Sequence, residues 1–148
     1  MENKNNYDEK SCGTILFCGR GEGLRFLLIK NPSDNKCGFP KGHVEGGESE
    51  TQTALRETWE ETSIKPTLIE GFRRATLYPL KNGRKKLVVY FLGKFENQTP
   101  KVNPSFEKHS FVLLPYSEAR RALAFQNARE LLDMAYSQLK LLGYTEDI

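Results

Sequence analysis

The sequence predicts an α+β domain in which helices pack on a mixed β-sheet. Its 148 residues match the usual size of one domain. Short apolar runs bounded by turn residues alternate irregularly with two stretches of helical periodicity, which argues against a regular βαβ repeat. We therefore expect a polar, flexible tail over residues 1–10 and a single domain over residues 11–148.

Composition excludes several classes of protein. Hydrophobic residues make up 38% and charged residues 28% of the chain, and the net charge of +3 is too small to indicate nucleic-acid binding. No apolar run is long enough to span a bilayer, and the N-terminal residues lack the apolar core of a secretory signal. Three cysteines without a closely spaced pair fit buried free thiols in a reducing, cytoplasmic setting better than disulfides or a zinc site.

Five segments have the branched and aromatic composition of strands. The glycine-rich stretch 19–23 between the first two misses the dinucleotide-binding spacing, so it predicts a hairpin turn and not a phosphate loop. Asn82 and Gly83 predict another tight turn, between the third and fourth segments. The five predicted strands are 11–17, 24–29, 68–77, 86–92 and 111–114.

A first helix is predicted over residues 50–62. Ser49 is a suitable N-cap, and Gln52 completes a capping box three residues later. Trp59 follows Leu55 by four residues, so we expect these two side chains to mark the buried side of the helix.

A last helix is predicted to begin near Ser117 or near Asn127 and to run to Leu142. Its apolar residues recur at intervals of three and four, which is the pattern of one buried stripe. They are Ala128, Leu131, Leu132, Ala135, Leu139 and Leu142.

The first helix carries an unusual acidic cluster. Glu57, Glu60 and Glu61 are spaced i, i+3 and i+4, so they share one face within a single turn. Like charges this close repel one another, and a hard divalent cation such as Mg²⁺ would supply the missing counter-charge. Gly46 and Gly47 precede the helix in a loop whose backbone N–H groups favour an anion. The alternative interpretation is an acidic face exposed to solvent.

This segment resembles the Nudix box, which reads Gly, five residues, Glu, seven residues, Arg-Glu, an aliphatic residue, any residue, Glu-Glu, any residue, Gly and an aliphatic residue. Thr58 replaces an aliphatic residue, and Ser63 replaces the glycine that ends the helix. The resemblance implies a Nudix-type α/β/α sandwich and Mg²⁺- or Mn²⁺-dependent hydrolysis of a nucleoside diphosphate linked to another group. The matching positions are Gly42, Glu48, Arg56, Glu57, Glu60, Glu61 and Ile64.

By position, the resemblance also implies roles for single residues. Glu57, Glu60 and Glu61 would be metal ligands, and Glu57 or a later glutamate would act as general base. Glu107, in the loop before the strand at 111–114, would reach back to the metal cluster as a further catalytic and metal-binding carboxylate, and the backbone carbonyl of Lys41 would add a ligand.

Arg56 and Glu48 would form a partly buried ion pair that orients the helix. His109 is treated as a surface histidine.

Beyond the box, the chain is similar to asymmetrical diadenosine tetraphosphate hydrolases in the segments 39–45, 54–58 and 70–72. This similarity implies water attack on the polyphosphate, with ATP and AMP as products.

Candidate substrate-binding residues follow from the chemistry of a polyphosphate dinucleotide. Lys41 and His43 lie next to the acidic segment and are expected to contact phosphate. Adenine needs flat apolar partners, and Tyr78, Tyr90 and Phe125 are the candidates, with core packing as the alternative role of each. A basic group surrounds the predicted hairpin, and Lys85 is its candidate for substrate binding. The group comprises Arg73, Arg74, Lys81, Arg84, Lys85 and Lys86.

Other functions remain open at this point. The same site would suit an inositol pyrophosphate or an RNA 5′ end, and a non-catalytic nucleotide-sensing module would use the same scaffold. The expected partner is a nucleotide polyphosphate, with neither a membrane nor a nucleic acid as the main ligand. The sequence leaves the oligomeric state open.

Overall fold

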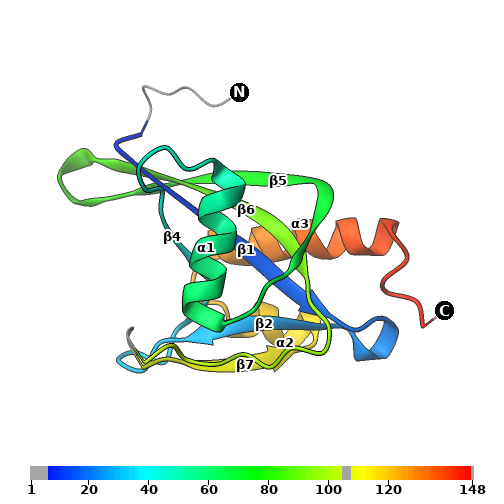
Figure 1. Ribbon diagram of the computed structural model, residues 1–148. Coiled ribbons are helices and arrows are strands. Elements are labelled where there is room, and N and C mark those ends of the chain that lie inside the picture. Colours follow the sequence, from blue (N-terminus) through cyan, green and yellow to red (C-terminus); the bar gives the residue numbers. More distant parts are fainter. Residues whose placement is uncertain (1–6, 105–107, 148) are drawn as a thin grey trace.

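The computed structural model describes residues 7–104 and 108–147. Within these residues, seven strands form one sheet that is flanked by three helices (Figure 1). The helices are α1 (Glu50–Thr62), α2 (Tyr116–Ala122) and α3 (Gln126–Leu141). The strands are β1 (Glu9–Cys18), β2 (Arg25–Lys30), β3 (Cys37–Gly38), β4 (Lys41–His43), β5 (Thr67–Pro79), β6 (Lys85–Lys94) and β7 (Ser110–Leu114).

The sheet is mixed, as predicted. Its strand order is β3-β2-β1-β6-β5, with β4 also paired to β1 and β7 to β2. β1 and β6 run parallel, whereas the other pairs are antiparallel. The central position of β1 matters for the site, because β1 supports both α1 and the short strand β4 that precedes it.

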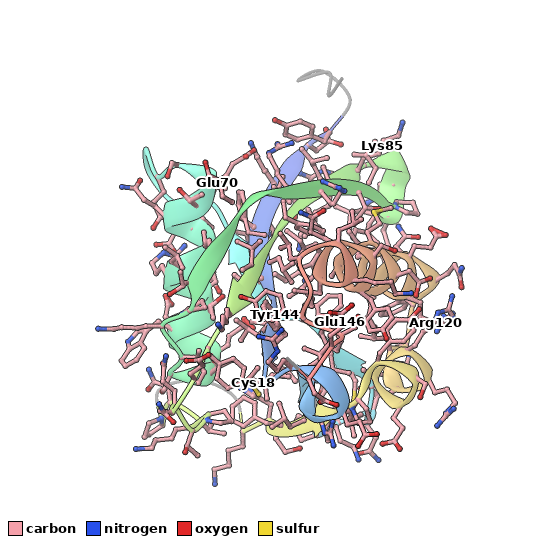
Figure 2. All side chains as sticks on the ribbon, turned by 90° about the vertical axis from the view of Figure 1, so that its right-hand side faces the viewer. Cys18, Glu70, Lys85, Arg120, Tyr144 and Glu146 are labelled. Carbon is pink, nitrogen blue, oxygen red and sulfur yellow. The ribbon has the colours of Figure 1, made fainter. Side chains whose placement is uncertain are left out.

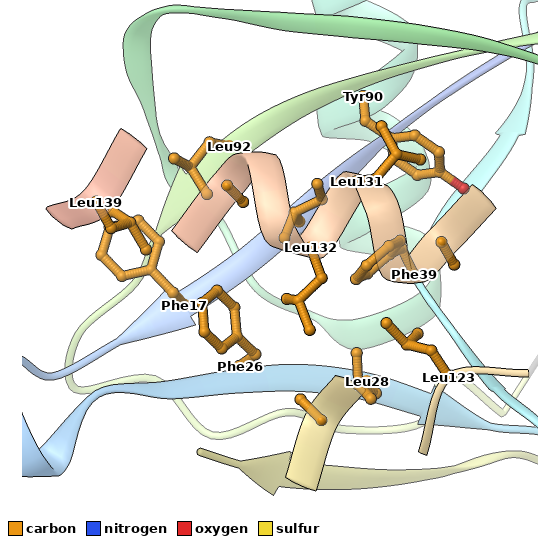
Figure 3. Packing of buried hydrophobic residues seen from close by; sticks show 14 of the residues in the cluster. Phe17, Phe26, Leu28, Phe39, Tyr90, Leu92, Leu123, Leu131, Leu132 and Leu139 are labelled. Atoms are coloured by element: carbon orange, nitrogen blue, oxygen red, sulfur yellow. The ribbon is translucent and has the colours of Figure 1, made fainter. Parts of the chain in front are cut away.

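Alternation along β1 builds the two faces of the sandwich. Cys12 and Leu16 belong to apolar clusters on the side of α1, and Thr14 bonds to that helix. Ile15 and Phe17 enter the large cluster that α2 and α3 cover. The predicted α/β/α sandwich is therefore confirmed. Figure 3 shows how leucines of α3 and Leu123 close the large cluster over the sheet.

Several boundaries differ from the sequence prediction. The strand predicted at 11–17 already begins at Glu9, and the backbone N–H of Asp8 donates to the carbonyl of Lys85 at 2.8 Å. Residues 7–10 therefore do not belong to a flexible tail. The short strands β3 and β4 were not predicted, because Pro40 and the neighbouring glycines disguise them.

The predicted C-terminal helix is two helices, and each proposed starting point lies within one residue of a real one. No helix in the described ranges is sufficiently long and apolar to cross a membrane.

Helix α1 has the predicted bounds and the predicted capping box, but its buried side is not the predicted one. Leu55 is 37% and Trp59 45% exposed. The helix instead rests on small side chains spaced by four, Ala54, Thr58 and Thr62, all fully buried. This orientation turns the glutamate face toward β4 and not toward solvent.

Both departures from the Nudix box are accommodated locally. The buried Thr58 hydroxyl pairs with the Thr14 hydroxyl at 2.7 Å, so its polar atom is satisfied inside the sandwich. Ser63 caps α1 in the left-handed conformation, with φ of 60° and its N–H donating to the Trp59 carbonyl at 2.8 Å. The backbone thus takes the turn that a glycine would take, at the steric cost that a side chain carries there.

The Thr14–Thr58 pair gives a test of the packing between α1 and the sheet. Thr58→Val should destabilise the fold by about 1–3 kcal/mol, because it leaves the buried Thr14 hydroxyl without a partner. The double variant Thr14→Val/Thr58→Val should recover most of that loss, since both hydroxyls are then removed. Urea unfolding of the wild type, of Thr14→Val, of Thr58→Val and of the double variant measures the coupling free energy between the two hydroxyls. Strictly additive effects of the two single substitutions would contradict a stabilising hydrogen bond between Thr14 and Thr58.

Candidate active site

Three adjoining hollows form one groove beside α1. The acidic hollow, of about 290 Å³, is lined by Ile29, Asn31, Pro32, Glu57, Glu60, Glu61 and His109. The aromatic hollow, of about 280 Å³, has Phe39, Tyr78, Lys86, Tyr90 and Phe125 in its wall. A connecting hollow shares Ile29, Asn31 and Glu61 with the first and Phe39, Lys41 and Phe125 with the second.

One arginine organises the acidic face of α1. Arg56 donates from Nε to Glu48 Oε2 at 2.7 Å and from Nη1 to Glu57 Oε1 and Glu60 Oε1, both at 2.8 Å. Its Nη2 donates to the carbonyl of His43 at 3.0 Å, which ties the helix to β4. The predicted Arg56–Glu48 pair is confirmed, and the hydrogen bond from Arg56 lowers the pKa of Glu48 to about 2. The contacts of Arg56 with Glu57 and Glu60 were not predicted.

Glu61 lies deeper than its two partners and does not reach the guanidinium. Its Oε2 accepts a long hydrogen bond of 3.3 Å from the backbone N–H of Lys41. Burial raises the pKa of the Glu61 carboxyl to about 8, and the negative charge of Glu57 adds to the shift. An ionised Glu61 would therefore be stabilised strongly by a nearby cation.

Gly42 provides the space that this cluster needs. A Cβ placed on Gly42 would overlap with the carboxylate of Glu57, so the absence of a side chain lets the glutamate lie directly over β4. Lys41, whose carbonyl is the remaining candidate ligand, is the adjacent residue of β4.

The donor chemistry of this cluster fits a hard divalent cation, because three carboxylates face one hollow from a single turn. Within residues 7–104 and 108–147, no three acidic, histidine or cysteine side chains converge as metal ligands. The reason is visible in the contacts: Glu57 and Glu60 are directed at Arg56. Glu107 lies outside the described residues.

The three aromatic candidates lie together in the aromatic hollow. Tyr90 is only 2% exposed and packs edge-on against Phe39, so it belongs to the core while it also lines the hollow (Figure 3). Phe125 is 58% exposed, with Lys36 Nζ 5.5 Å from its ring centre. Tyr78 is partly buried and lines the same hollow, which therefore offers flat apolar walls.

Of the basic residues that the sequence indicated, Lys41 and Lys86 line the groove, and Lys36, which was not predicted, lines the connecting hollow as well. Burial, together with the charge of Lys41, lowers the pKa of Lys86. The predicted substrate-binding residue was its neighbour Lys85, which is exposed near the tip of the β5–β6 hairpin (Figure 2). There, the backbone N–H of Lys85 donates to Asp8 Oδ2. The alternation of side chains along β6 could have indicated Lys86, because Lys86 lies on the same face of that strand as Tyr90.

The structure places the two histidines differently from what the sequence indicated. The side chain of His43 is 63% exposed, pairs with Glu9 at 3.2 Å and is not among the residues that line the three hollows. His109, expected at the surface, lines the acidic hollow, and its Nε2 donates to the backbone carbonyl of Glu61 at 2.7 Å. No local sequence pattern connects these two positions.

Comparisons with known proteins found a matching family model, similar sequences and similar folds. A family model described as the NUDIX domain matches residues 10–134. The asymmetrical bis(5′-nucleosyl)-tetraphosphatase of Sus scrofa is 34% identical over 140 residues, which is 88% of this chain and 95% of the relative. The crystal structure of a Caenorhabditis elegans Ap4A hydrolase binary complex superposes with a TM-score of 0.80 at 27% identity and covers 90% of this chain and 98% of that one.

A further solved structure, the NUDIX domain of Shewanella oneidensis NrtR with ADP ribose, has a TM-score of 0.71 at 20% identity. It covers 93% of this chain and 94% of that one, and at this identity the likeness concerns the fold.

The Arg56–Glu48 pair predicts a specific pH dependence. Because the pKa of Glu48 falls from 4.5 to about 2 on folding, its contribution to stability is present above pH 4.5 and is lost as the pH falls toward 2. Glu48→Gln should therefore flatten the acid side of a plot of Tm against pH. Glu70→Gln, at an exposed position of β5, is the control and should leave the plot of Tm against pH as in the wild type. An unchanged plot for Glu48→Gln would contradict a contribution of the Arg56–Glu48 pair to stability.

Proposed function

Because the chain belongs to the NUDIX family of hydrolases, we propose that it hydrolyses diadenosine tetraphosphate to ATP and AMP with Mg²⁺ or Mn²⁺. Its relatives identify it as a pyrophosphohydrolase, and members of the family generally use divalent metal ions.

The continuity of the groove carries this proposal. A dinucleoside polyphosphate combines flat bases with a long anionic chain, and the groove joins an aromatic hollow to an acidic one through Lys41. Lys41 lines the aromatic and the connecting hollow, Lys86 lines the aromatic hollow, and both are suited to bind phosphate oxygens. An inositol pyrophosphate offers no flat apolar ring, so the aromatic walls favour a nucleotide.

The names of the relatives support the same substrate. Curated proteins of Sus scrofa and Mus musculus named asymmetrical bis(5′-nucleosyl)-tetraphosphatase are 34% and 33% identical to this chain, each aligned over 88% of it. The Caenorhabditis elegans structure is also named an Ap4A hydrolase.

In the proposed mechanism, the divalent ion would be held by Glu57, Glu60, Glu61 and the Lys41 carbonyl, with Glu107 as a further ligand. When bound, the ion neutralises phosphate oxygens and lowers the pKa of a water molecule. One of the glutamates accepts a proton from the attacking water as a bond forms to phosphorus and the P–O anhydride bond breaks. Lys41 and Lys86 stabilise the charge that builds up on the leaving phosphates, while Tyr78 and Phe125 hold one adenine between them.

A substrate panel tests the activity directly. We expect hydrolysis of diadenosine tetraphosphate in the presence of Mg²⁺, with ATP and AMP released in equal amounts. In ¹⁸O-labelled water, mass spectrometry of the products shows which phosphorus was attacked. Preferred release of phosphate from an inositol pyrophosphate, or from a triphosphorylated RNA end, would replace the proposed substrate, and nucleotide binding without turnover would indicate a sensing module.

The acidic cluster is tested by charge-neutral variants. Glu60→Gln and Glu61→Gln should each lower kcat by about 100-fold or more, because each removes a negative charge from the ion-binding face. Glu61→Gln should leave Tm unchanged or raise it, since it removes a carboxyl whose ionisation burial disfavours. Steady-state kinetics measures kcat and thermal unfolding measures Tm, each with Glu70→Gln as the control. Wild-type turnover by either variant would remove that glutamate from the mechanism.

A further inference from the structure

The acidic hollow has a second wall that the proposed mechanism leaves without a role. Antiparallel pairing of β2 with β7 places Lys30 across from Ser110, so the next residues along this register are Asn31 and His109. Asn31, Pro32 and His109 all line the hollow with the three glutamates of α1. In Figure 1, the end of β2 and the start of β7 lie beside the C-terminal end of α1.

His109 is held in one orientation. Its Nε2 lies 2.7 Å from the carbonyl oxygen of Glu61, and its ring packs perpendicular to Phe111 with the ring centres 5.2 Å apart. A carbonyl oxygen only accepts hydrogen bonds, so Nε2 is a protonated nitrogen, and in the tautomer with a single ring proton Nδ1 is an acceptor. The side chain thus presents a flat ring, fixed by these two contacts, in the wall of the hollow.

The other part of this wall is a hydrogen-bonded turn at Asn31 and Pro32. Asn31 Oδ1 accepts hydrogen bonds from the backbone N–H of Ser33 at 2.9 Å and from its hydroxyl at 2.8 Å. These bonds close a local turn around Pro32, whose ring is exposed and has a fixed φ. The wall therefore pairs a rigid aliphatic ring with a rigid aromatic one.

We propose that Pro32 and His109, which line the acidic hollow but not the connecting hollow, form a subsite for the second nucleoside of a dinucleoside polyphosphate. This inference rests on the proposed function. A phosphate chain that starts at the aromatic hollow passes Lys41 in the connecting hollow and then enters the acidic hollow, which shares Glu61 with the connecting hollow. The second base packs against the Pro32 ring, and a ribose hydroxyl or a base amino group donates to His109 Nδ1.

The test compares binding with and without the second nucleoside. The KM of diadenosine tetraphosphate is measured together with the Ki of adenosine 5′-tetraphosphate as a competitor, which reports on binding of a tetraphosphate chain with one nucleoside. Pro32→Ala removes the ring, and His109→Gln replaces the imidazole while keeping an N–H donor for the Glu61 carbonyl. Pro100→Ala, in a loop whose proline does not line the three hollows, is the matched control.

In both test variants, we expect the ratio of KM to Ki to rise at least about fivefold, the scale of losing a contact with one base, while the control keeps the wild-type ratio. A parallel rise of KM and Ki would assign these residues to general positioning of the glutamates and overturn the subsite. Unchanged KM and Ki would overturn it as well. Failure of the wild-type protein to cleave diadenosine tetraphosphate would instead refute the proposed function, and the subsite with it.

Discussion

The rest of the site depends on the hydrogen bonds that the guanidinium of Arg56 makes. The guanidinium lies between three carboxylates, those of Glu48, Glu57 and Glu60, and also bonds to a carbonyl of β4. Without this positive charge, the partly buried glutamate carboxylates of α1 would repel one another. Arg56 thereby holds the helix against β4 and keeps two of the glutamates at the groove, whereas Glu61 stays without a cationic partner among these contacts.

The orientation of α1 follows from that arrangement. Because the glutamate face is turned toward β4, the helix meets the sheet through small residues, and its large apolar side chains Leu55 and Trp59 lie outside. Thr58, unusual for a Nudix box, fits this interface because Thr14 of β1 satisfies its hydroxyl. The substitution in the motif and the residue facing it on the sheet form one unit.

The groove combines parts of the chain that are distant in sequence. Its acidic wall comes from α1, its aromatic wall from β5, β6 and the start of α3, and its remaining wall from the ends of β2 and β7. Lys41 lies where these parts meet, since β4 pairs with β1 directly beneath α1. A long anionic ligand with a flat ring suits this arrangement better than a compact phosphate would, because the separate chemistries follow one another along a path.

The sequence by itself determined what depends on neighbours within a few residues: the bounds of α1 through its capping box and the spacing of its glutamates. The pair of Arg56 with Glu48 was implied by the resemblance to the Nudix box. Tertiary structure decided what depends on distant partners. Burial of Thr58 instead of Trp59 and the approach of His109 to Glu61, 48 positions away, come from packing between segments that no local pattern links. Helix caps and side-chain periodicity act within one or two turns, whereas the face that a helix buries is set by the surface it meets.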